Sequence, residues 1–119
     1  MGKNAHTTLK SMLSILSIYE ILKIERFPSA FDENDYNAVC EYLVKLPDGV
    51  VYFIYLGGND VDVKLIDKNE NSTVYTIRNK PYHKVDCALG IMILNCLLYG
   101  KDMVALVENT NKTVEQYLS

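Results

Sequence analysis

Three strand-like segments between residues 50 and 78 constrain the fold most, because the turns that separate them are very short. Residues 50–56 are continuously apolar and aromatic, which is typical of a central strand. Residues 61–65 and 73–78 alternate apolar and polar side chains, as half-exposed strands do. Turns of this length join antiparallel neighbours. The sequence therefore predicts a three-stranded antiparallel meander here.

A helix is predicted ahead of the meander, over residues 7–25. From Ser11 its sequence repeats one polar and two apolar residues, and nine of the thirteen residues from 12 to 24 are apolar. Because this repeat is shorter than the 3.6-residue helical turn, the apolar surface winds around the helix. One small domain would have difficulty covering such a surface. We therefore expect this helix to contribute to a closed two-fold homodimer.

A second helix is predicted between Pro28 and Pro47, with Asp32 as its N-cap. Apolar residues recur along it at helical spacing, namely Tyr36, Val39, Cys40, Leu43 and Leu46. Residues 84–99 are apolar nearly all round but fall short of the ~18 residues of a membrane span, which predicts a buried core helix. A last helix is predicted over residues 104–118, with a break near residues 109–111.

These segments predict one domain of the α+β class over residues 1–119. The expected order is α-α-β-β-β-α-α, in two layers, with the three-stranded meander packed by helices. The three cysteines have no disulfide or metal-binding spacing, so we expect a reducing, cytoplasmic compartment. Because the longest apolar segment is too short, we also expect no membrane span. The two histidines lie far apart in the sequence and no Cys-x-x-Cys occurs, which predicts neither a metal site nor a cofactor.

Acidic residues are concentrated in one part of the chain. Residues 29–71 carry nine acidic and three basic side chains, against a net charge of −3 for the whole chain. Such a block can steer a basic protein partner. Asp60 and Asp62 are the sharper candidates because no capping role is evident for them, and an aromatic residue would form the apolar centre. The predicted partner-binding residues are Asp32, Glu33, Asp35, Tyr36, Tyr55, Asp60 and Asp62.

A basic loop, residues 78–84, is the second candidate site. It precedes a predicted helix N-terminus, where unpaired N–H groups favour phosphate or carboxylate, and Tyr82 is placed to stack on a base. The loop lacks the glycines with which a backbone wraps a phosphate, and the net negative charge argues against general nucleic-acid binding. The predicted anion-binding residues are Arg78, Lys80, His83 and Lys84.

His83 and Cys87 form the one nucleophile and base pair that the sequence suggests, because four residues separate them on a helix. Cys87 leads into the most apolar segment, where burial would raise the pKa of its thiol, so we interpret it as a core cysteine. The leading hypothesis is thus a non-enzymatic protein-binding module of the inhibitor, immunity-protein or adaptor type. The alternatives are an anion- or nucleic-acid-binding regulator and a small cysteine-dependent enzyme.

Overall fold

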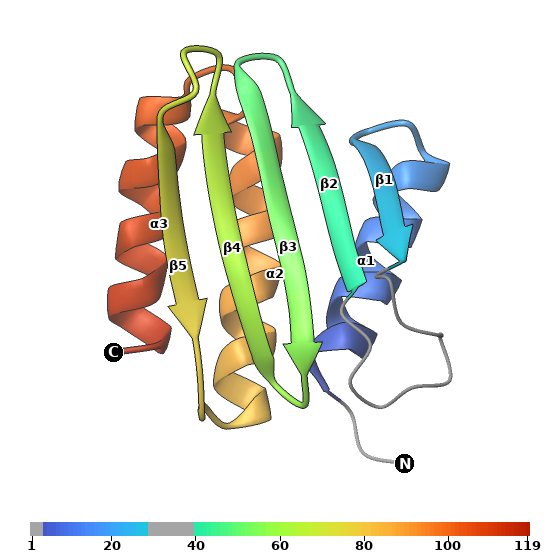
Figure 1. The fold of residues 1–119 in the computed structure, drawn as a ribbon, viewed down its shortest axis with the longest axis vertical. Helices are drawn as coiled ribbons and strands as arrows, with labels where there is room; N and C mark the ends of the chain where they lie inside the picture. Colours follow the sequence, from blue (N-terminus) through green and yellow to red (C-terminus); the bar gives the residue numbers. More distant parts are fainter. Residues whose placement is uncertain (1–3, 29–39) are drawn as a thin grey trace.

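The computed structural model describes residues 4–28 and 40–119, which form an antiparallel sheet of five strands with three helices on one face (Figure 1). The strands lie in the sheet in chain order, each paired with its sequence neighbours. The elements are α1 (Ala5–Ile18), β1 (Lys23–Pro28), β2 (Cys40–Leu46), β3 (Gly49–Gly57), β4 (Asp60–Asp67), β5 (Ser72–Ile77), α2 (Tyr82–Tyr99) and α3 (Met103–Tyr117). The predicted α+β class and the two layers are confirmed, and the order is α-β-β-β-β-β-α-α.

The predicted meander is confirmed as β3, β4 and β5, but β1 and β2 extend it to five strands. The helix predicted over residues 40–46 is therefore wrong, because this segment is β2. Tyr42 pairs with Phe53 and Val44 with Val51, and all four side chains are buried under the helices. The apolar residues of this segment fit both an alternating and a helical pattern, and the segment adopts the strand that the alternating pattern indicates. The rest of the predicted second helix lies outside the described residues.

Helix α1 ends seven residues earlier than the predicted position 25, at Ile18. The Ile21 N–H donates to the Leu16 carbonyl and the Glu20 N–H to the Ser17 carbonyl, each at 3.0 Å. These two bonds form a Schellman motif, and Glu20 takes the left-handed position of that motif with a φ of 57°. The motif reverses the chain, so the residues that would have formed two more helical turns become β1.

Helices α2 and α3 follow the prediction except that α3 continues through residues 109–111 without a break. Its polar side chains bond back to carbonyls one turn earlier, with Asn109 donating to Ala105 at 2.8 Å and Thr110 to Leu106 at 2.7 Å. Asn95 of α2 is buried, and its amide donates to the Thr113 hydroxyl at 3.2 Å.

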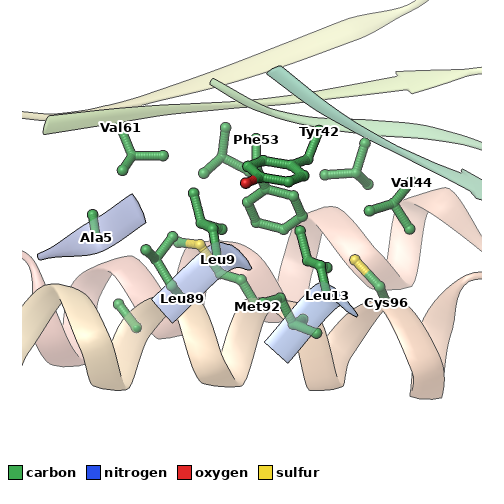
Figure 2. Close-up of a cluster of buried hydrophobic side chains, with 14 of the residues drawn as sticks. Ala5, Leu9, Leu13, Tyr42, Val44, Phe53, Val61, Leu89, Met92 and Cys96 are labelled. Atoms are coloured by element: carbon green, nitrogen blue, oxygen red, sulfur yellow. The ribbon is translucent and has the colours of Figure 1, made fainter. Parts of the chain in front are cut away.

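The core fills the space between the sheet and the helices (Figure 2). Phe53 and Val61 point down from the sheet, while Leu9 from α1 and Leu89 and Met92 from α2 point up toward them. All five are at most 2% exposed. One hydrophobic cluster therefore holds all three helices against the same face of the sheet.

Candidate interaction surfaces

Asp60 and Asp62 of the predicted acidic site lie against the basic loop at one end of the sheet. The other acids of that site, Asp32, Glu33 and Asp35, and Tyr36 with them, lie outside the described residues. Gly57 and Gly58 turn the chain between β3 and β4 with φ angles of 135° and 58°. Asp60 then accepts a hydrogen bond from the Asn79 N–H at 3.2 Å. Asp62 forms an ion pair with Arg78 at 2.9 Å. The two acids thus have structural partners in the basic loop, which sequence reasoning did not foresee.

The remaining residues of the basic loop divide between surface and structure. His83 and Lys84 are exposed in the first turn of α2, and Lys80 is half-buried. Tyr82, the predicted stacking residue, turns its hydroxyl toward α1. There it lies 3.0 Å from the Thr8 hydroxyl and donates to Asp86 at 3.3 Å, while Thr8 donates to Asp86 at 2.5 Å. Tyr82 therefore helps to join two helices.

The predicted burial of Cys87 is wrong, because Cys87 lies on the exposed side of α2. The cysteine that the core does enclose on this helix is Cys96, and burial raises the pKa of its thiol to about 12. Within residues 4–28 and 40–119, no group of three His, Cys, Asp or Glu side chains is placed to hold a metal ion.

A polar cluster beneath α1 was missed by sequence reasoning. His6 lies 3.0 Å from the Tyr42 hydroxyl and stacks on Tyr55, with ring centroids 4.9 Å apart and planes 18° apart. Burial, together with the charges of Arg26 and Lys10, lowers the pKa of His6 below its ordinary value. The cluster joins α1 to β2 and β3 with a neutral imidazole. Tyr55, predicted as an outward anchor, therefore faces the helices.

The other face of the sheet carries no helix among the described residues, and it is turned toward the viewer in Figure 1. Because side chains alternate along a strand, the neighbours of buried Val51 and Phe53 point to this face. Tyr52 lies there between Leu43 and Lys64, and Ile54 between Glu41 and Asp62. We call this the open face. Its apolar members are Phe27, Leu43, Val50, Tyr52, Ile54, Ile66 and Val74.

Charges on the open face are separated along the strands. One cross-strand row places the carboxylates of Glu41 and Asp62 on either side of Ile54. Lys64 lies beside Tyr52 in the next row, and Lys45 lies beside Val50 one row further on, where it pairs with Glu25 of β1. The open face therefore has an apolar centre with two carboxylates toward the β3–β4 turn, of which Asp62 is paired with Arg78.

Comparison with known proteins adds no relative: no family model, no curated protein and no solved structure matches this chain. Of the helices in the described part of the chain, none combines the length and the apolar character that crossing a membrane requires.

Proposed function

We propose that this protein is a non-enzymatic protein-binding module that recognises a basic protein partner with the open face of its sheet. The observation that carries the proposal is the asymmetry of the sheet. One face is covered by all three helices, whereas the other presents exposed or half-buried apolar side chains from β1, β3, β4 and β5. Contiguous exposed apolar surface with a polar rim is typical of protein interaction sites.

The chemistry of the open face indicates the kind of partner. Tyr52 and Ile54 lie at its centre on β3, where a large aromatic side chain suits a binding hot spot. Glu41 lies beside Ile54, so a partner with an apolar patch next to a lysine or arginine would match both parts. Asp62, on the other side of Ile54, is paired with Arg78. Tyr52 replaces Tyr55 as the proposed anchor, since Tyr55 stacks on His6.

The role of the basic loop as an anion-binding regulator is the weaker proposal. Arg78, its one guanidinium, is already paired with Asp62. Lys84 and His83 remain exposed at the start of α2, which is what a weak anion contact would need. A cytoplasmic location is part of the main proposal and is supported by the three cysteines, all of which are free thiols.

The test begins with isolation of a partner from cell lysate on the immobilised protein, followed by binding kinetics with the purified partner. Tyr52→Ser should weaken its affinity by about tenfold or more, because it removes the apolar centre. Glu41→Gln should mainly slow association and reduce the dependence of the rate on salt, because it removes a rim charge. Thermal melts establish that each variant is folded.

Matched control variants come from the exposed side of α3. Val104→Ser removes an exposed apolar side chain and Glu108→Gln an exposed carboxylate, and both should bind as the parent does. If Tyr52→Ser and Glu41→Gln bind the partner with unchanged kinetics, the open face is not the binding surface. If Lys84→Gln instead causes a salt-dependent loss of affinity for the partner while the open-face variants bind unchanged, the anion-binding role is favoured.

A further inference from the structure

The outer surface of α1 and α2 carries large apolar side chains that the chain itself leaves exposed. From α1 and the turn after it these are Ile15, Ile18, Tyr19 and Ile21, and from α2 they are Leu94, Leu97 and Leu98. Each is between 37 and 76% exposed. We call these residues the helix patch. Helix α2, predicted from its sequence to be buried all round, is thus buried on one side only.

A groove joins the two parts of the helix patch. Thr8 bonds to Asp86, and Met12 lies opposite Gly90, where an added Cβ would be 3.6 Å from the Met12 methyl carbon. Both pairs have the same sequence offset, so α1 and α2 run in the same direction where they meet. Toward their C-terminal ends the two helices separate (Figure 1), and the groove between them is lined by Ile21 from one side and by Leu97 and Leu98 from the other.

The size of the helix patch exceeds what a monomer normally exposes. Taking about 200 Å² for a fully exposed large side chain, the exposed fractions correspond to roughly 800 Å² in total. The largest apolar patch on a typical monomer is about 300–600 Å². One side of a stable protein–protein interface buries about 800 Å².

The helix patch also contains both parts of a self-complementary contact. Ile18 and Tyr19 protrude, with 76 and 72% of their surface exposed. The turn that follows them lines a groove of about 620 Å³, which runs from this turn to the end of α2, with Ile21, Leu97 and Leu98 in its lining. Protruding side chains and a groove on one surface are what a two-fold contact requires, because each copy supplies both.

Charges around the groove are of both signs. Glu20 lines it on the α1 side, and Lys23 and Lys101 line it on the β1 side and after α2. Lys45 of β2 also lines the groove and is paired with Glu25. A partner of one strong charge would be repelled by part of this rim, whereas a second copy brings a carboxylate to a lysine and a lysine to a carboxylate. We infer that the helix patch joins two copies of this chain into a closed two-fold dimer, on the side of the molecule opposite the open face.

The dimer is tested by sedimentation velocity over a wide range of concentrations. The parent should reach the mass of a dimer, while Ile18→Lys and Leu98→Lys should each weaken the dimer by about tenfold or more. Lysine is chosen because each position lies in the last turn of its helix, where a positive charge is favourable. Val104→Lys, at an α3 residue that is 71% exposed, is the control and should remain dimeric.

A parent that stays monomeric at high concentration would overturn the inference, as would dimers that persist in both patch variants. Circular dichroism establishes that the variants are folded. If either is not, Ile18→Ser and Leu98→Gln replace them, and dimers that persist in both would equally overturn it. A monomeric parent that co-sediments with lipid vesicles would assign the helix patch to a membrane surface instead. Partner binding through the open face is unaffected by these outcomes, so the two proposals fail separately.

Discussion

Replacing Gly90 with alanine should stabilise the protein, although glycine in a helix often marks a place where a neighbour approaches too closely for a side chain. Here an added Cβ would lie 3.6 and 3.8 Å from the methyl carbon and sulfur of Met12, which is ordinary van der Waals contact. Alanine is better than glycine inside a helix by about 1 kcal/mol. The free energy of unfolding should therefore rise by about 1 kcal/mol, equivalent to about 4 °C in Tm for a chain of this size.

Urea unfolding followed by circular dichroism, at one fixed protein concentration, measures the change. Gly49→Ala is the contrasting variant, because its Cβ would lie 2.3 Å from the Ile66 carbonyl oxygen and should cost about 1–3 kcal/mol. If Gly90→Ala lowers the urea midpoint with an unchanged slope, α1 packs closer to α2 than described.

Three further outcomes are expected. Glu20→Gly should raise the free energy of unfolding by about 1 kcal/mol in urea titrations, because glycine adopts the left-handed position of the Schellman motif without strain. A thiol reagent at neutral pH should label exposed Cys87 in the folded protein and leave buried Cys96 unlabelled until unfolding, as mass spectrometry would reveal. The pKa of His6 lies below its ordinary value of 6.5, so the unfolded chain takes up this proton first as the pH falls. The contribution of neutral His6 to stability should therefore be complete above pH 6.5 and be lost as the pH falls through the folded-state pKa. Denaturation of His6→Gln over the same pH range should show a smaller loss of stability as the pH falls.

The meander was predictable because its signals are local. Alternation and short turns between residues 50 and 78 define both the strands and their antiparallel pairing. Residues 40–46 carry two signals at once, since Cys40, Tyr42 and Val44 alternate while Cys40 and Leu43 also fit a helical stripe. Pairing with β3 decides between them, and pairing is a tertiary interaction that the segment alone does not encode.

The end of α1 and the polar cluster were beyond local reasoning for different reasons. Glu20 stops the helix with a left-handed backbone, a role in which glycine is the usual signal. His6, Tyr42 and Tyr55 are brought together only by the fold, and nothing in their neighbourhoods marks them. For the open face, the choice of Tyr55 over Tyr52 depended on strand parity. Side chains at odd and even positions of a strand point to opposite faces of the sheet, so Tyr55 faces the helices and Tyr52 faces the open side.

The position of α2 and α3 at the end of the chain has a consequence for how the protein is made. Strands pair with sequence neighbours, so the meander can form as the chain leaves the ribosome, which releases the N-terminal part first. The parts of β3, β4 and β5 that α2 and α3 cover then stay bare until residues 82–117 have been synthesised. Thr8 meets its partner Asp86 only at that stage. A nascent chain arrested after β5 therefore exposes Phe53 and Val63 on a sheet face that α2 and α3 do not yet cover. Such a chain is a substrate for chaperones and is prone to aggregate.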